Sequence, residues 1–218
     1  MDLSVAEYAQ QRGISRQRAL SMIRAGQIEA KRIGRSWVIN QREAGHRAAL
    51  GRPLGRRMAR VLVDVISGYS FDDLDPQDRF VAASYLNRLR DAENPAELLY
   101  SWLKSRQIQV VNLFANPADL AEIARDERVV LSGISDERSG MSSARELEGY
   151  VALGNLEAFK NDNLLVASDS PNVRFHVVEG LPSRPVPLGL VLADLADWNR
   201  PRENGRIVDL LREVKWSR

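Results

Sequence analysis

The sequence predicts a mixed α/β protein of the α+β kind, in which a helix-turn-helix with a following hairpin precedes a helical segment and a mixed C-terminal domain. Three observations carry this prediction. Apolar residues recur at helical spacing through most of the first 106 residues, and short alternating segments mix with helical ones after them. Positive charge is concentrated at the start of the chain, because residues 1–60 hold 13 Lys and Arg against four Asp and Glu. We therefore predict three parts, at 1–48, 49–106 and 107–218.

The first two helices are marked by their caps. Ser4 can cap the first helix while Glu7, three residues later, completes a capping box. A turn with Gly13 follows, and Ser15 caps the second helix, which runs to Gly26. Two short helices joined by a tight turn are typical of a helix-turn-helix.

A small basic hairpin is predicted next. Residues 28–33 and 36–39 alternate around Gly34-Arg35, so the whole N-terminal part has a winged arrangement. Trp37 alternates within this hairpin, which favours a place in its core over a role in stacking on bases.

These segments resemble the excisionase/MerR-type winged-helix DNA-binding domain. The resemblance covers about the first 45 residues and is carried by 3–9, 13–16, Gly26 and 31–39. It implies that the second helix enters the major groove and that the hairpin contacts the DNA backbone or the minor groove. Some winged helices of this kind are protein-interaction modules instead, which is the alternative for this part.

Two sets of DNA contacts follow from this resemblance. Base edges would be read at the start of the second helix, by Ser15, Arg16, Gln17 and Arg18. Phosphates would be contacted by Arg24, Lys31, Arg32, Arg35 and Ser36. Arginines of the following segment would extend this footprint, and these are Arg52, Arg56 and Arg57. A solvated basic linker is the other interpretation of that segment.

Three helices are predicted in the central part. The first carries an apolar stripe from Leu54 to Val65, and two others begin at Asp75-Pro76 and Asn94-Pro95, which are favourable helix starts. The inner face of the second of these helices is predicted to contain Phe80, Val81, Ala83, Tyr85, Leu86 and Leu89. Tyr85 and Trp102 are assigned to the core rather than to a ligand pocket.

The C-terminal part mixes strands and helices. Strands are predicted at 108–113, 129–133 and 148–151, with helices at 116–124, 155–159, 187–198 and 201–214. Residues 164–167 and 172–178 are expected to pair as a hairpin across 168–171. This mixture favours an α/β or α+β domain with antiparallel pairing near its end.

Composition argues against most enzyme classes. The 218 residues include two His and no Cys, which excludes disulfides, thiolate chemistry and Cys-type zinc sites. No Walker loop, dinucleotide fingerprint or HExxH motif is present, so we expect no enzyme activity, no cofactor and no metal. An enzyme with an unfamiliar α/β site would need a pocket that gathers carboxylates distant in the sequence.

No apolar run approaches the length of a membrane helix and no signal-peptide pattern is present, so we expect a cytoplasmic protein.

A few titratable residues are candidates for a functional site. His176 lies on an alternating segment and is expected to be a packed or edge histidine rather than a base. Two pairs of aspartates, Asp72 with Asp73 and Asp194 with Asp197, have the composition that metal sites use. Solvated helix faces or helix caps are the favoured interpretation of both pairs.

The whole chain shows a second resemblance, to actinobacterial antitoxin-like regulators linked to the abortive-infection AbiE class. Its motifs are 51–54, 129–135 with the loop after it, 148–151, 172–173 with 177–179, and the ending 192–197 with 201–202. In that class the antitoxin binds its own promoter through an N-terminal winged helix, and the partner gene encodes a nucleotidyltransferase-like toxin. The N-terminal part of this chain departs from the class, because it resembles the excisionase/MerR type instead.

Together these observations predict a sequence-specific DNA-binding transcriptional regulator. The resemblances imply a bacterial repressor of its own operon, associated with the nucleoid when bound to DNA, and an antitoxin. One winged helix covers few base pairs, so we expect two copies, by homodimerisation or by paired sites. The alternative is a protein-interaction module that neutralises a toxin directly, because residues 61–218 hold 18 Lys and Arg against 25 Asp and Glu.

Overall fold

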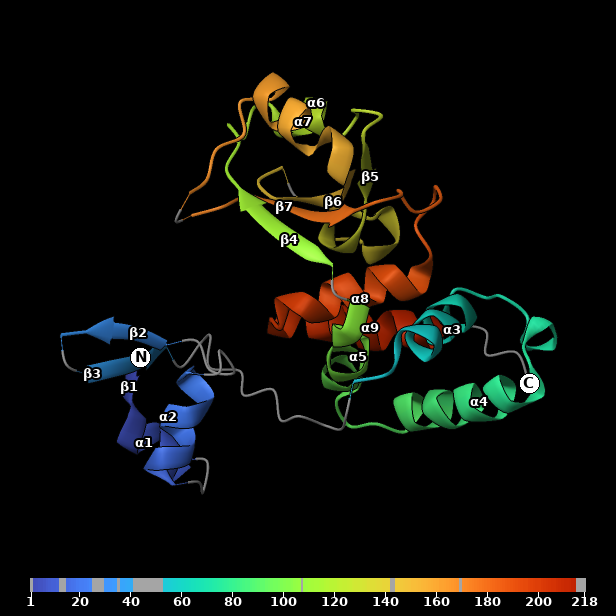
Figure 1. Ribbon diagram of the computed structural model, residues 1–218, viewed down its shortest axis with the longest axis horizontal. Helices are drawn as coiled ribbons and strands as arrows, with labels where there is room; N and C mark the ends of the chain where they lie inside the picture. The colour runs from blue at the N-terminus through green and yellow to red at the C-terminus, as the bar shows by residue number, and fades with distance from the viewer. Residues whose placement is uncertain are drawn as a thin grey trace. The chain divides into compact units, whose positions relative to one another are not determined.

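A computed structural model describes residues 2–11, 15–24, 30–34, 36–40, 53–106, 108–141, 144–168 and 170–214. The described chain is a mixed α/β protein with nine α-helices and two sheets, which confirms the predicted class (Figure 1). It divides into two compact units, Met1–Leu50 and Gly51–Arg218. None of its described helices combines the length and the apolar character needed to cross a membrane.

The first unit contains two helices and a three-stranded antiparallel sheet. Its elements are β1 (Asp2–Ser4), α1 (Val5–Gln11), α2 (Arg16–Arg24), β2 (Ala30–Ile33) and β3 (Ser36–Asn40). The strand order is β1-β3-β2, with Arg32 opposite Trp37 in the predicted hairpin. β1 was not predicted, because three residues are too few to show an alternating pattern.

Local hydrogen bonds explain where these elements begin. The backbone N–H of Ser4 donates to the Glu7 carboxylate at 2.8 Å, and the N–H of Glu7 donates to Ser4 Oγ at 3.2 Å. Ser15 Oγ accepts from the N–H of Arg18 at 3.2 Å at the start of α2. The capping box and the second cap are therefore confirmed. Gly34 turns the hairpin with a φ of +62°, a left-handed conformation that favours glycine.

A separate small core holds the first unit together. Its buried members are Leu3, Val5, Tyr8, Ala9, Ala19, Ile23 and Ile39. Trp37 is partly buried against this cluster, as predicted for a residue of the hairpin core. The unit thus has its own apolar interior, built from α1, α2 and the sheet.

The second unit has a helical layer around a larger core. Its long helices are α3 (Arg56–Ile66), α4 (Pro76–Arg90), α5 (Pro95–Leu103), α8 (Leu188–Trp198) and α9 (Pro201–Glu213). Asp75 accepts from the N–H of Gln77 at 2.9 Å and Asn94 from the N–H of Glu97 at 3.3 Å, which confirms both predicted helix starts. One buried cluster includes Trp102 from α5 and Leu192 from α8. Residues that the sequence assigned to separate parts, 49–106 and 107–218, therefore share a core.

Phe80 corrects the predicted inner face of α4. The helix buries Ala82, Leu86 and Leu89, whereas the Phe80 side chain is 79% exposed. Phe80 precedes Ala82 by two residues, which is about 200° around a helix, so a helix that buries Ala82 turns Phe80 outward. Tyr85 is partly buried against the core and Trp102 is fully buried, as predicted.

A four-stranded mixed sheet lies between two helical layers. Its strands are β4 (Gln109–Leu113), β5 (Val129–Leu131), β6 (Leu147–Ala152) and β7 (Val173–Val178), in the order β4-β7-β6-β5. β6 and β7 are parallel, and the other pairs are antiparallel. The short helices α6 (Leu120–Ile123) and α7 (Leu156–Asp162) lie on one side of the sheet and α8 and α9 on the other (Figure 1). Five 3₁₀ turns complete the unit, at Phe71–Asp73, Lys104–Arg106, Gly133–Ser135, Glu137–Ser139 and Leu153–Asn155.

The expected hairpin between 164–167 and 172–178 is wrong. Val166 forms a bridge with Phe114 instead, and β7 lies between β4 and β6. The physical reason is burial. β7 buries Val173, Phe175, His176 and Val177, so its backbone N–H and C=O groups are also away from water and need partners on both edges. The Val166 side chain, in contrast, remains 55% exposed.

Two helical glycines provide a test of this packing. A Cβ added at Gly189 in α8 would lie 2.5 Å from the carbonyl oxygen of Val63 in α3, whereas one added at Gly205 in α9 would meet nothing within 4 Å. We expect Gly189→Ala to lower the free energy of unfolding by about 1–3 kcal/mol, because the two helices would have to separate. Gly205→Ala, the matched control, should raise it by about 0.5–1 kcal/mol. Urea unfolding of both variants measures the difference, and equal effects would contradict the close approach of α8 and α3.

Candidate nucleic-acid interface and buried polar cluster

The predicted base-reading residues lie together at the start of α2. Ser15, Arg16, Gln17 and Arg18 are all exposed, whereas Ala19 is fully buried in the core of the unit. Ser15 uses its hydroxyl as the helix cap. The three long side chains that follow it lie on the exposed side of a helix whose other side is buried.

The predicted phosphate contacts are distributed over several elements. Lys31 and Arg32 are exposed on β2, Arg24 ends α2 and Ser36 begins β3. Arg35 and Arg52 lie outside the described residues.

The two remaining arginines of this set belong to the second unit. Arg56 and Arg57 are exposed at the start of α3, and Arg57 forms an ion pair with Asp78 at 2.6 Å. A phosphate at Arg57 would therefore compete with a carboxylate that is already bound.

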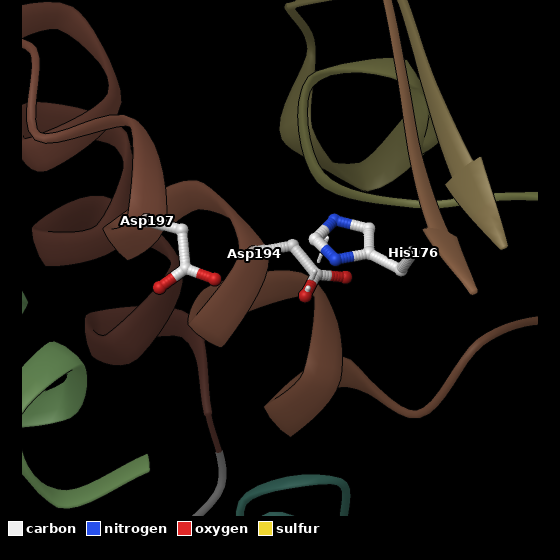
Figure 2. Close-up of side chains that lie close together, drawn as sticks. All are labelled: His176, Asp194 and Asp197. Atoms are coloured by element: carbon white, nitrogen blue, oxygen red, sulfur yellow. Dashed lines mark ion pairs between the residues drawn. The ribbon is translucent and has the colours of Figure 1, made fainter. Parts of the chain in front are cut away.

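The second unit contains a buried polar cluster between the sheet and α8. We use this name for eight residues: Arg106, Ser132, Glu148, Tyr150, His176, Asp194, Asp197 and Trp198. Figure 2 shows His176, from β7, facing Asp194 of α8, with Asp197 one turn further along the helix. The side chains of Glu148, Asp194 and His176 are at most 1% exposed.

Asp194 is the centre of the cluster. Its carboxylate accepts hydrogen bonds from Ser132 Oγ at 2.6 Å, Tyr150 Oη at 2.9 Å and Arg106 Nη1 at 2.8 Å. His176 Nε2 lies 3.7 Å from it. The expectation that Asp194 and Asp197 form a solvated helix face is therefore wrong for Asp194, which is 0% exposed, and only Asp197 keeps contact with solvent.

A second buried carboxylate, Glu148 of β6, is equally well supplied with donors. It accepts from His176 Nε2 at 2.9 Å, Trp198 Nε1 at 2.7 Å and the backbone N–H of Ile134 at 2.9 Å. Gly133 makes room for it, because a Cβ there would lie 1.9 Å from Glu148 Oε2. Gly133 also has a φ of +53°, so both space and backbone conformation require glycine at this position.

The pKa shifts in the cluster follow from burial and from neighbouring charges. Burial lowers the pKa of His176, but attraction to Asp194 and the contact with Glu148 outweigh burial and raise this pKa above its usual value. Burial raises the pKa of Asp194, but His176 and Arg106 outweigh it, and the net shift is downward. The pKa of Asp197 is raised by burial. Burial and the neighbouring Asp194 also raise the pKa of Tyr150 well above its usual value.

The cluster has some features of a metal site but is better explained as a structural one. Ligand atoms of His176, Asp194 and Asp197 all lie within 4.8 Å of one another. Arg106, however, donates to Asp194 at 2.8 Å and to Asp197 at 3.0 Å, and so supplies the positive charge between these carboxylates. Because Glu148, Asp194 and His176 are at most 1% exposed, these members of the cluster can fix the position of α8 on the sheet.

Sequence reasoning missed this cluster, although part of a signal was present. Glu148 and His176 are ionisable residues inside mostly apolar strands, and such residues need polar partners when they are buried. Their partners were not visible in the sequence, because Glu148 is 28 positions from His176 and 50 positions from Trp198. His176 was correctly interpreted as a packed histidine.

Comparisons with known proteins give no family for this chain: no family model, no curated protein and no solved structure matches it.

The raised pKa of His176 predicts a specific pH dependence of stability. A histidine whose folded pKa is above its unfolded value of about 6.5 stabilises the protein below that pH, and this contribution is lost as the pH rises through the folded pKa. We expect the free energy of unfolding to fall over this window in the natural protein. In His176→Gln, which keeps a donor for Glu148 but does not titrate, this fall should be absent. Urea unfolding followed by circular dichroism measures it, with His46→Gln as the control, and an unchanged slope in His176→Gln would disprove the assignment.

Proposed function

We propose that this protein binds double-stranded DNA through its N-terminal unit and acts as a transcriptional regulator, a repressor of its own operon. The observation that carries the proposal is the exposure of Arg16, Gln17 and Arg18 on the first turn of a helix whose opposite face is buried. The order helix, helix and hairpin is that of a winged helix-turn-helix, which supports this assignment. The resemblance to the excisionase/MerR type also supports DNA binding.

In the proposed mechanism, α2 lies in the major groove. Arginine can donate two hydrogen bonds to O6 and N7 of guanine, and glutamine pairs with N6 and N7 of adenine, so Arg16, Gln17 and Arg18 have the chemistry for reading sequence. Lys31 and Arg32, exposed on β2, would neutralise phosphates and so supply affinity without sequence preference. Base contacts and backbone contacts thus come from separate elements of one unit, so they can be tested separately.

A second candidate function is the neutralisation of a toxin by direct binding, with DNA binding secondary. It is favoured by the acidic excess of residues 61–218 and by Phe80, whose exposed ring borders a groove on α4. Ala83, Asn87, Arg88 and Leu98 also line that groove. A basic toxin with an apolar side chain for this groove is the partner that fits, and the resemblance to AbiE-class antitoxins supports such a pairing.

The DNA-binding proposal predicts different effects for the two kinds of contact. Arg16→Ala should weaken binding to the operator by about 1–3 kcal/mol and leave non-specific DNA almost unaffected. Arg32→Ala should weaken binding to both and reduce the slope of log K against log salt by about 0.9, the value for one phosphate. Fluorescence anisotropy with promoter DNA of the operon measures both effects. Arg79→Ala, an exposed arginine of α4, is the control. Absence of binding at low salt, or binding indifferent to Arg16→Ala and Arg32→Ala together, would refute the proposal.

The toxin-binding alternative predicts co-purification with the product of the adjacent gene. Phe80→Asp should reduce the recovered partner at least about tenfold, which corresponds to about 1.4 kcal/mol of binding free energy. Tyr69→Asp, at a second exposed aromatic residue that is 58% exposed, is the matched control. Equal recovery with both variants would show that the α4 groove is not part of the interface. No recovery with the natural protein would refute toxin binding.

A further inference from the structure

The second unit contains a cavity beside the segment that leads into α8. Its volume of about 330 Å³ lies within the range of small-molecule sites in proteins. Three segments that are distant in the sequence line it: residues 67–69 after α3, Arg138 in a 3₁₀ turn, and residues 183–188. The fold of the whole unit therefore builds this cavity, rather than a single loop.

The charge that lines the cavity is positive. Arg138 and Arg184 both line it, and no Asp or Glu of the described residues does so. Arg138 is paired with Asp136, but the hydrogen bonds of Arg184 go only to backbone carbonyls, and no described carboxylate pairs with it. Because arginine stays charged at every physiological pH, the cavity keeps a positive charge that the described chain does not compensate.

The fold holds the guanidinium group of Arg138 in place. Its Nε and Nη2 each donate to the Asp136 carboxylate at 2.8 Å, and Nη2 also donates to the carbonyl oxygen of Val186. Asp136 is itself 7% exposed, so this partner belongs to the packed structure. Nη1 makes no hydrogen bond within the described chain.

Arg184 is held in a similar way from the other side of its guanidinium group. Its Nη2 donates to the carbonyl oxygens of Glu127 at 2.6 Å and Val129 at 2.8 Å, beside β5. Nε and Nη1 have no hydrogen-bond partner among the described residues. Both arginines of the cavity are thus fixed by one part of the guanidinium group and keep N–H donors on another.

This arrangement suits an oxyanion. The donors of arginine form a planar fork that matches two oxygens of a carboxylate or a phosphate. A side chain that the fold already holds loses less conformational entropy on binding than a mobile surface arginine does. The arginines are therefore organised in advance for an anionic group.

The rest of the cavity is mainly apolar and accessible from solvent. Tyr69 is 58% exposed at its wall, and Pro185, Pro187 and Leu188 lie beside it. The two prolines restrict the backbone, so this wall has little freedom to collapse. An apolar or aromatic group attached to the oxyanion would be in contact with these side chains.

We propose that this cavity binds a small organic anion, in which a phosphate or carboxylate group is joined to an apolar or aromatic body. The oxyanion accepts hydrogen bonds from Arg138 and Arg184, and the body packs against Tyr69 and the prolines. The site lies within the second unit and does not rest on the proposed DNA binding.

The first test is a titration of the ¹⁵N-labelled full chain, followed by NMR, with adenosine monophosphate, benzoate and inorganic phosphate as probes. We expect at least one of the two organic anions to shift the amide signals of Gly68, Tyr69 and Leu188 saturably. Its dissociation constant should be at least about tenfold below that of inorganic phosphate, which has no body for the apolar wall. Binding of the nucleotide alone identifies a phosphate ligand, and binding of benzoate alone identifies a carboxylate. Absence of saturable shifts with all three probes, or inorganic phosphate binding as tightly as both organic anions, overturns the proposal.

The second test changes the charge of the cavity without disturbing its packing. Tyr69→Glu adds a carboxylate at an exposed position beside the arginines, so it should raise the dissociation constant of the bound anion at least about tenfold. Phe80→Glu is the matched control, because it makes the same change of charge at a 79% exposed position outside the cavity. Equal binding by the two variants overturns the proposal.

Removal of a donor gives an independent measurement. Arg184→Met should also raise the dissociation constant at least about tenfold, because it removes the uncompensated charge. Arg79→Met, at an exposed arginine of α4, is its control. Circular dichroism checks that both variants fold, and Tyr69→Glu alone decides the proposal if Arg184→Met does not. Binding by a folded Arg184→Met as tight as by Arg79→Met contradicts the assigned site.

Discussion

The burial of the Asp194 carboxylate is the constraint on which the second unit depends. A buried carboxylate is strongly unfavourable unless charged and polar partners surround it. Here the partners come from separate parts of the chain: Arg106 after α5, Ser132 after β5, Tyr150 on β6 and His176 on β7. Because Asp194 itself lies on α8, this single group sets where the helix sits on the sheet.

The same polar groups determine which face of the sheet turns toward α8. Leu147, Val151, Val173 and Phe175 belong to the apolar cluster on the α6 and α7 side, whereas Glu148 and His176 alternate with them and point to the other side. A slip of β6 or β7 by one residue would move a carboxylate or an imidazole into that apolar cluster. The buried polar cluster therefore specifies the register of β6 and β7, while the apolar residues supply the free energy of folding.

The sequence predicted interactions between neighbouring residues correctly, and it failed where an interaction joins distant parts of the chain. The capping box at Ser4 and Glu7 and the Asx-Pro helix starts were predictable, because donor and acceptor lie within three residues. The exposure of Arg16 to Arg18 was also predictable, because these residues directly follow the Ser15 helix cap. The position of β7 between β4 and β6, the outward turn of Phe80 and the burial of Asp194 depend on elements far away in the sequence, so local patterns gave wrong answers for all three.

The separate interiors of the two units have an evolutionary consequence. The buried residues of the N-terminal cluster all lie between Leu3 and Ile39, and those of the two larger clusters all lie between Leu54 and Leu211. Recombination in the segment between them would disturb neither interior. Each interior can therefore be inherited or exchanged without the other.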